Sequence, residues 1–356
     1  MHGNWMRPTR RVAAIGALLF AFVAGPRAAV ADAALDAKID AAAADFRAST
    51  GVENFALLMM RGEEVLYRRD FGAYGPATAI PIASATKWIT GATVMTLVDE
   101  GRLSLDAPVK TYLPELAAPY GDLTLRLLLS YTAGLDSILK LVDIRQDRTI
   151  TLAQSAEEIA KLPLADPPGT AFRYGGANFQ IAGAVVERVT GKRWSDYFFE
   201  ALGTPLQMSP FRWSIPNPKI PADKVLNPIL QGGAVTSADS YGRFLTMIAR
   251  KGVLEGKRYL SAAAVDEMDK VETRNVEMKL VPPGAGDSNP QYALAHWCER
   301  EGPTGCAMLT SPGAYGTYPW IDVENGLHGI ILVQDRLERI AAAERRLRDA
   351  MIAAAR

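Results

Sequence analysis

The stretch IPIASATKWITGATVMTLVDEG, residues 80–101, determines how this sequence is expected to fold. A short apolar run ends at Ser84, and the apolar residues after it recur at the spacing of a helix with one buried face. Gly101 then supplies a helix stop. Side chains three positions apart on a helix project from the same side, so the sequence predicts that the Ser84 hydroxyl and the Lys87 amine lie together at the first turn.

The pairing of serine with lysine suggests a nucleophile and its base. A serine hydroxyl attacks a carbonyl when a neighbouring base removes its proton. Lysine can be that base where burial and nearby charges lower its pKa, and the helix N-terminus favours developing negative charge. The same Ser-x-x-Lys pattern recurs at Ser137 and Lys140. Taken alone, either copy could be a serine that caps a helix, followed by a lysine in solvent. The long apolar helix favours the copy at Ser84.

The first 31 residues predict a signal peptide. Three arginines precede an uncharged apolar run over residues 12–25, and small residues offer a cleavage site after Ala31. The run is shorter than the roughly 20 residues that span a membrane. We expect a periplasmic or secreted protein, with an uncleaved anchor as the alternative. Arg10 and Arg11 hint at twin-arginine export, and the sequence does not decide between this route and the general secretory (Sec) route.

The composition describes a globular protein that acts on a small molecule. The chain has 356 residues, 49% of them hydrophobic, and the predicted mature part carries 35 basic and 39 acidic side chains. This balance indicates neither nucleic acid nor an anionic membrane as a partner. The sequence contains no metal-ligand pattern, no phosphate-binding loop and no dinucleotide fingerprint, so we expect no metal and no cofactor. The oligomeric state is not indicated.

Histidine and cysteine usage excludes other chemistries. His296 and His328 lie in strand-like stretches and are expected to be structural, and no G-x-S-x-G elbow supports an α/β-hydrolase triad. Cys298 and Cys306 have seven residues between them, which makes no metal pattern. In an oxidising compartment they could pair across a hairpin-like loop, although the sequence leaves open whether they are bonded.

The order of elements predicts an α/β (α+β) fold. Residues 54–72 predict a hairpin, with an apolar strand over 55–60, a turn at Arg61 and Gly62, and a second strand over 64–71. The middle of the chain is mostly helical, and residues 203–230 hold six prolines and suggest a wandering surface segment. Four strand-like stretches and a closing helix follow: 292–297, 306–310, 317–323, 327–334 and 337–355. We therefore expect one antiparallel sheet built from both ends of the chain, flanked by helices, with an inserted helical region.

Several ordered segments resemble the serine β-lactamase-like family, which includes class C β-lactamases, D-aminopeptidases and related esterases. The similar segments are IASATK (82–87) with GRLSLDAPVKTYLPEL (101–116), LTLRLLLSYTAGL (123–135), PPGTAFRYGGANFQIAGAVVERVTG (167–191), GGAVTSADSYGRFLTMI (232–248) and SPGAYGTYPWID (311–322). The resemblance covers most of the mature chain. It implies a β-lactamase/transpeptidase-like fold over residues 32–356, with 32–80 and 232–356 as the α/β part and 81–231 as the mostly helical part.

The resemblance also implies roles for individual residues. Ser84 would be acylated, Lys87 would be its proton partner, and Tyr174 would complete the base system with a lowered pKa. The backbone N–H groups of Ser84 and Ala314 would form the oxyanion hole. Tyr131 stands where the family often has histidine.

Two departures from the family pattern concern substrate binding. Gly176 stands where the tyrosine motif often carries asparagine, and Ser311 with Gly313 stands where the active-site strand usually has Lys or His, any residue, then Gly. Ser311 has no charge to hold a substrate carboxylate, and Gly176 has no amide to hold a carbonyl. A neutral ester has fewer polar groups to satisfy. Aromatic residues could shape an apolar pocket or simply form core: Trp88, Trp297, Tyr315, Tyr318 and Trp320.

These features predict an exported serine hydrolase, most simply a carboxylesterase that works through an acyl-enzyme on Ser84. One alternative keeps the mechanism and changes the substrate to a β-lactam, a D-amino acid peptide or a small amide. A further alternative is an inactive binding protein with this fold. The natural substrate is not specified by the sequence.

Overall fold

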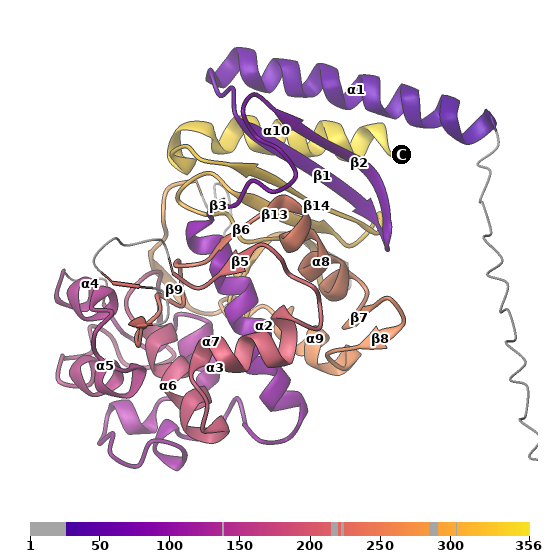
Figure 1. Cartoon of the computed structure of the whole chain (residues 1–356). Helices are drawn as coiled ribbons and strands as arrows, with labels where there is room; N and C mark the ends of the chain where they lie inside the picture. Colours follow the sequence, from indigo (N-terminus) through magenta and orange to yellow (C-terminus); the bar gives the residue numbers. More distant parts are fainter. Residues whose placement is uncertain (1–25, 137–138, 215–219, 222–223, 285–290, 304) are drawn as a thin grey trace, which may run out of the picture.

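The computed structural model describes residues 26–136, 139–214, 220–221, 224–284, 291–303 and 305–356. Its centre is a seven-stranded antiparallel sheet in the order β10-β11-β12-β13-β14-β1-β2. The strands are β1 (Phe55–Arg61), β2 (Glu64–Phe71), β10 (Gln291–Tyr292), β11 (Trp297–Gly302), β12 (Gly305–Thr310), β13 (Tyr318–Asp322) and β14 (Leu327–Val333). In the middle of the sheet β1 pairs with β14, so that Phe55 lies opposite Val333. The predicted sheet from both ends of the chain is confirmed (Figure 1).

The alternation of side chains along β1 builds two cores, one on each face of the sheet. Phe55, Leu57 and Met59 face the layer of α1 (Pro26–Thr50) and α10 (Leu337–Ala354), which covers one face (Figure 1). Ala56 and Leu58 point to the opposite face and join the larger core, where α8 (Ala238–Ala249) packs. Because both faces of the sheet are covered, β1 is apolar on both faces, and it pairs with β2 as the predicted hairpin.

The middle of the chain forms a helical region beside the sheet (Figure 1). Its helices, with one from the later chain, are α2 (Thr86–Asp99), α3 (Leu125–Leu129), α4 (Leu139–Gln146), α5 (Leu152–Ile159), α6 (Asn178–Thr190), α7 (Trp194–Phe198) and α9 (Ala262–Met268). In the described part of the chain, three small sheets lie outside the central sheet. One consists of β3 (Ile80–Pro81), β6 (Val235–Thr236) and β5 (Phe211–Arg212), the second of β4 (Ala171–Arg173) and β9 (Glu277–Leu280), and the third of β7 (Val253–Leu254) and β8 (Lys257–Arg258).

The helix that follows Ser84 is more central than its sequence predicted. We expected one buried face, but α2 is buried from Thr86 to Leu97 on every side. It contacts α6 and α9, and Gly91 lies so close to Ala295 that an added Cβ would come within 2.6 Å of the Ala295 side chain. A helix enclosed by other elements needs apolar or internally bonded residues all round, and Thr93 meets this need by donating to the Ile89 carbonyl.

Two predictions for the later chain were wrong. The apolar stretch 292–297 is not one strand, because Ala295 takes a left-handed conformation (φ 70°) and bends the chain between β10 and β11. The proline-rich segment 203–230 is not only surface: Trp213 and Asn227 are buried. The Asn227 side chain accepts a hydrogen bond from Gln180 (2.7 Å), which brings the end of this segment into the core beside α6.

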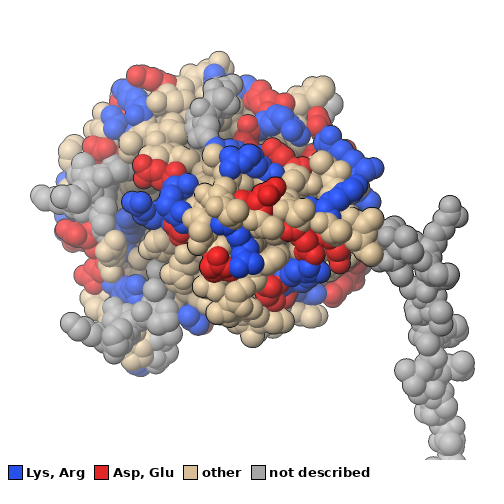
Figure 2. All heavy atoms as spheres, turned by 90° about the horizontal axis from the view of Figure 1, so that it is seen from above, with Lys and Arg blue, Asp and Glu red and all other residues tan. Residues whose placement is uncertain are grey.

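Residues 1–25 of the predicted signal peptide lie outside the described residues, and residues 26–31 form the start of the α1 backbone. Of the helices in the described part of the chain, none combines the length and apolarity that crossing a membrane requires. Seen from above the layer of α1 and α10, basic and acidic side chains alternate over the surface, and this face has no continuous patch of one sign (Figure 2).

Candidate active site

Ser84 lies in a tight 3₁₀ turn, Ala83–Ala85, that leads directly into α2. Ala83 has a positive φ of 44°, a conformation that costs an alanine energy and persists only when neighbouring contacts hold it. One such contact is local, because the Thr86 hydroxyl donates to the Ala83 carbonyl at 2.6 Å. The turn therefore presents the Ser84 side chain from a strained and fixed backbone.

Distant parts of the chain hold this turn in place. The Ser311 hydroxyl donates to the Ser84 carbonyl (3.2 Å), and the Tyr241 hydroxyl donates to the Ala85 carbonyl (2.8 Å). Gly313 approaches so closely that a Cβ there would lie 2.2 Å from the Ile82 carbonyl oxygen. Only glycine fits this contact. The structure thus gives Ser311 and Gly313 positions against the nucleophile turn, and neither is among the residues that line the cavity in front of Ser84.

Lys87 lies behind Ser84 in the core. Its Nζ is 2.8 Å from Ser84 Oγ and 2.7 Å from the carbonyl oxygen of Gln231, and the residue is only 2% exposed. Burial lowers the pKa of the Lys87 amine well below its ordinary value, and the positive charge of Arg145 lowers it further. A buried amine with a lowered pKa next to a hydroxyl has the properties of a general base.

Tyr174 approaches the same serine from the other side. Its ring lies 4.6 Å from Lys87 Nζ and stacks on Trp297 with ring centroids 5.4 Å apart. Burial raises the pKa of the Tyr174 hydroxyl, and hydrogen bonds with Ser84 and Trp297 only partly offset this effect. The lowered pKa expected from the family resemblance is therefore not found. Tyr174 stays protonated at neutral pH and is placed to pass a proton rather than to start as a phenolate.

The backbone around Gly176 is held by residues that the sequence analysis missed. The carbonyl oxygen of Gly176 accepts hydrogen bonds from Gln231 Nε2 (3.1 Å) and Arg145 Nη1 (3.2 Å). Asn178, two positions further along the chain, has its Oδ1 3.1 Å from where a Cβ on Gly176 would lie. Gln231 and Arg145 are 55 and 31 positions from Gly176, and no local pattern could have connected them to it.

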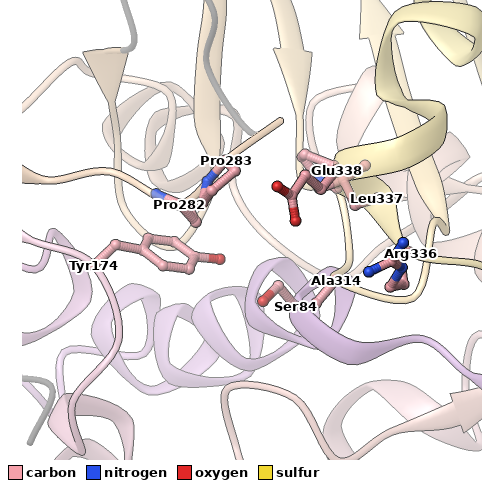
Figure 3. A pocket seen from close by; sticks show the side chains of 9 residues that line it. Ser84, Tyr174, Pro282, Pro283, Ala314, Arg336, Leu337 and Glu338 are labelled. Atoms are coloured by element: carbon pink, nitrogen blue, oxygen red, sulfur yellow. The ribbon is translucent and has the colours of Figure 1, made fainter.

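A cavity of about 270 Å³ opens in front of Ser84. Figure 3 shows the hydroxyls of Ser84 and Tyr174 pointing into it, with Ala314 on the serine side. The remaining lining residues are Pro282, Pro283, Pro312, Arg336, Leu337 and Glu338. None of these six was predicted as a site residue. Pro312 is the middle residue of the Ser311–Gly313 motif, while Pro282 and Pro283 lie in the loop after β9 and the other three lie at the start of α10, where no motif was recognised.

The predicted oxyanion residues lie on the same side of this cavity. Ser84 lies in the 3₁₀ turn before α2. Ala314 follows Gly313, and the N–H of Gly313 donates to the Thr317 carbonyl at 2.8 Å. The Ala314 carbonyl accepts the N–H of Leu337 (3.0 Å), which ties this loop to the start of α10. The two backbone N–H groups remain the predicted oxyanion hole.

The predicted aromatic pocket residues are dispersed. Trp320 is fully buried between the sheet and the layer of α1 and α10, and Tyr315 is 43% exposed outside the cavity lining. Trp88 stacks on His296, and Tyr318 is buried with a hydrogen bond to Glu299. Of these five aromatic residues, Trp297 is the one whose ring contacts the ring of a cavity-lining residue in the described part of the chain, namely Tyr174.

The other singled-out residues lie away from the cavity. Cys298 and Cys306 form a disulfide between β11 and β12, with Cα atoms 5.6 Å apart. His296 is 3.3 Å from Asp269, and His328 Nε2 is 2.9 Å from the Thr246 hydroxyl. Ser137, which opens the second Ser-x-x-Lys pattern, lies outside the described residues. Within the described ranges, no group of three or more His, Cys, Asp or Glu is placed to hold a metal ion.

A serine in a strained turn, a buried lysine with a lowered pKa and a protonated tyrosine around one cavity define the class of serine hydrolases that use lysine instead of histidine. The chain belongs to the beta-lactamase family, whose model matches residues 39–352. The antiparallel β-lactamase/transpeptidase-like fold is confirmed by a solved structure, a putative beta-lactamase from Bacteroides dorei: the TM-score is 0.77 at 26% identity, covering 89% of this chain and 98% of that one.

Two curated relatives match over shorter stretches. Protein flp of Staphylococcus aureus (strain MW2) is 27% identical over 165 residues, which are 43% of this chain and 33% of flp. Esterase EstB of Burkholderia gladioli is 33% identical over 184 residues, which are 45% of this chain and 46% of EstB. The chain thus aligns with about a third to a half of the length of these relatives.

Proposed function

We propose that this serine hydrolase is an exported carboxylesterase that cleaves small neutral esters through an acyl-enzyme on Ser84. The observation that carries the proposal is the contact of Lys87 Nζ with Ser84 Oγ (2.8 Å) beside a cavity walled by prolines and Leu337. Export is supported by the predicted signal peptide and by the disulfide between Cys298 and Cys306, since disulfides persist in oxidising compartments.

In acylation, Ser84 Oγ attacks the ester carbonyl and its proton passes to the neutral Lys87 amine. The N–H groups of Ser84 and Ala314 stabilise the negative oxygen. When the ester C–O bond breaks, the leaving alkoxide takes a proton from the Tyr174 hydroxyl, and Tyr174 is reprotonated by Lys87. In deacylation, a water molecule attacks the acyl carbon while its proton passes through Tyr174 to Lys87. Lys87 then returns a proton to Ser84 Oγ as the ester bond to the serine breaks.

The choice of a neutral ester follows from the polar groups around the serine. Ser311 contributes a hydroxyl that is already bonded to the Ser84 carbonyl, and Gly176 contributes no side chain. The carboxylate of a β-lactam would find no cation at Ser311, and the amide carbonyl of a peptide would find no side-chain donor at Gly176. An unpaired polar group in a desolvated site lowers the affinity for such a substrate. The similarity to EstB, which is named an esterase, points in the same direction.

The test is intact-mass spectrometry of the mature protein during turnover of p-nitrophenyl butyrate, with Ser84→Ala alongside. We expect nitrophenol release and a transient butyryl adduct on the wild type only. A chromogenic cephalosporin tests the alternative of a β-lactamase or amide hydrolase with the same mechanism. Failure of both substrates and of a serine-reactive phosphonate to modify the protein would leave the inactive binding protein as the better description.

A further inference from the structure

The cavity in front of Ser84 contains one carboxylate. Glu338 lies in the first turn of α10, and Figure 3 shows its carboxylate pointing into the same cavity as the hydroxyls of Ser84 and Tyr174. The side chain is exposed, and within the described part of the chain it has no hydrogen-bond or ion-pair partner. Its negative charge is therefore available to a substrate.

No neighbouring cation in the described part of the chain forms an ion pair with Glu338. Arg339, one residue on, is ion-paired with Asp335. Arg336 is the other charged residue of the cavity lining, and Figure 3 shows it beside Ala314, on the serine side of the cavity. The amine of Lys87 lies behind Ser84 and is buried.

The backbone that carries Glu338 is fixed relative to the reacting atoms. The N–H of Leu337 donates to the Ala314 carbonyl (3.0 Å), and the N–H of Asp335 donates to the Tyr315 carbonyl (2.9 Å). Leu337 is buried in the core between the sheet and α10. The start of α10 is thus tied to the loop that carries the predicted oxyanion N–H, so the backbone at Glu338 is fixed relative to that loop.

We propose that Glu338 is a specificity residue that binds an ammonium group of the substrate. The inference rests on the proposed esterase function and extends it from neutral esters to esters with a cationic group near the scissile bond. An ammonium group next to this carboxylate is attracted by its charge, with the modest strength that an exposed ion pair has. The same charge repels substrate carboxylates, which adds to the effect of the missing cation at Ser311.

The test compares two thioesters of the same shape, butyrylthiocholine and its uncharged carbon isostere 3,3-dimethylbutyl thiobutyrate. Released thiol is measured with a thiol-reactive dye, and the protein gives no background because its two cysteines are bonded to each other. We expect the wild type to prefer the charged thioester by roughly fivefold in kcat/KM, and less in high salt. In Glu338→Gln the ratio should fall to about one.

Arg336→Gln is the matched control, since it removes the opposite charge from the same cavity lining and should keep or increase the preference. A second isosteric pair places the charge in the acyl part: p-nitrophenyl 6-(trimethylammonio)hexanoate and p-nitrophenyl 7,7-dimethyloctanoate. A preference in either pair that Glu338→Gln removes supports the proposal and locates the ammonium group.

Equal rates within both pairs, or a preference that persists in Glu338→Gln, would overturn the role of Glu338 while leaving the esterase proposal intact. Absence of Ser84-dependent turnover with every ester would overturn the esterase proposal and this inference with it.

Discussion

Lys87 Nζ is anchored by the carbonyl oxygen of Gln231 (2.7 Å) while it contacts Ser84 Oγ (2.8 Å). The amine therefore keeps its orientation whether or not the serine is acylated. In its neutral form it can donate to Gln231 and direct its lone pair at the serine hydroxyl. This anchor is a main-chain atom, so its position depends on the fold of residues 229–233 rather than on the side chain at 231.

The first prediction concerns the nucleophile. Ser84→Ala should lower kcat by roughly 10⁴-fold or more, because the nucleophile and its base act as one unit. The free energy of unfolding should change by less than about 0.5 kcal/mol, since only one small hydroxyl is lost. Steady-state kinetics and thermal unfolding measure the two effects. Ser137→Ala, in the second Ser-x-x-Lys pattern, is the control, and a loss of turnover in it with retained activity in Ser84→Ala would reverse the assignment.

The second prediction concerns the dependence of kcat/KM on pH. Activity should rise with pH as Lys87 loses its proton, and this limb should lie below the ordinary range for lysine because burial and Arg145 lower the pKa of Lys87. Arg145→Gln removes a positive charge, so the pKa of Lys87 should increase and the limb should shift to higher pH.

Arg145→Lys is the control for this shift, because it retains the charge while it loses the planar guanidinium that bonds the Gly176 carbonyl. An unshifted profile in Arg145→Gln would mean that this charge does not act on the base. A profile that moves equally in both variants would assign the effect to the lost hydrogen bond.

The third prediction separates the hydroxyl of Tyr174 from its ring. Tyr174→Phe keeps the stacking on Trp297 but removes the proton that the leaving group needs, so kcat should fall by roughly 10²- to 10⁴-fold with little change in KM. Tyr292→Phe is matched to it: this ring also contacts Trp297, and its buried hydroxyl has no partner in the described part of the chain. Equal losses in both variants would indicate a packing effect.

The fourth prediction concerns the space beside the nucleophile turn. Gly313→Ala would place a Cβ 2.2 Å from the Ile82 carbonyl oxygen, so we expect a loss of about 1–3 kcal/mol in stability and a large loss of activity through displacement of the turn. In Gly232→Ala the nearest such contact would be 3.7 Å, to the Ala83 backbone. Thermal unfolding and kcat/KM of the pair check this, and equal effects would contradict it.

The fifth prediction uses a carboxyl far from the cavity. Glu344 in α10 is fully buried with neither oxygen bonded within the described residues, and burial raises its pKa well above the ordinary value, with Asp335 adding to the effect. Protonation is thus favoured in the folded state. The protonated Glu344 carboxyl therefore contributes to the free energy of unfolding below the pKa of about 4.5 that the group has in the unfolded chain. This contribution is lost as the pH rises towards the pKa of Glu344 in the folded protein.

Glu344→Gln removes this titration. Its stability relative to the wild type should increase with pH above about 4.5, by at most about 1.4 kcal/mol per pH unit. Denaturant unfolding between pH 4 and 8 measures the difference. A constant difference over this range would show that Glu344 does not titrate differently in the two states.

The sequence predicted what depends on nearby residues. The apolar run 55–60 with its following turn and the three-residue spacing of Ser84 and Lys87 are local patterns, and both appear in the structure. The family resemblance added Tyr174, which the structure places beside Lys87. The apolar run 292–297 was misleading because apolar residues also fill a buried bend, as they do around Ala295.

The parts that could not be predicted depend on contacts across long stretches of chain. Gln231 reaches Lys87 over 144 positions, and Ser311 reaches Ser84 over 227. Glu338 enters the cavity only because α10 begins next to Ala314. The spacing of residues along the sequence does not indicate which distant segments come into contact.

The pairing of β1 with β14 also has a consequence for how the protein is made. Residues 55–61 pair with residues 327–333, so the sheet cannot be completed until almost the whole chain has been synthesised. Until then the hairpin of β1 and β2 exposes an open edge, which is a site for pairing with the wrong strand. A chain that crosses a membrane before it folds would meet this hazard on the far side, where chaperones of that compartment would have to protect residues 55–71.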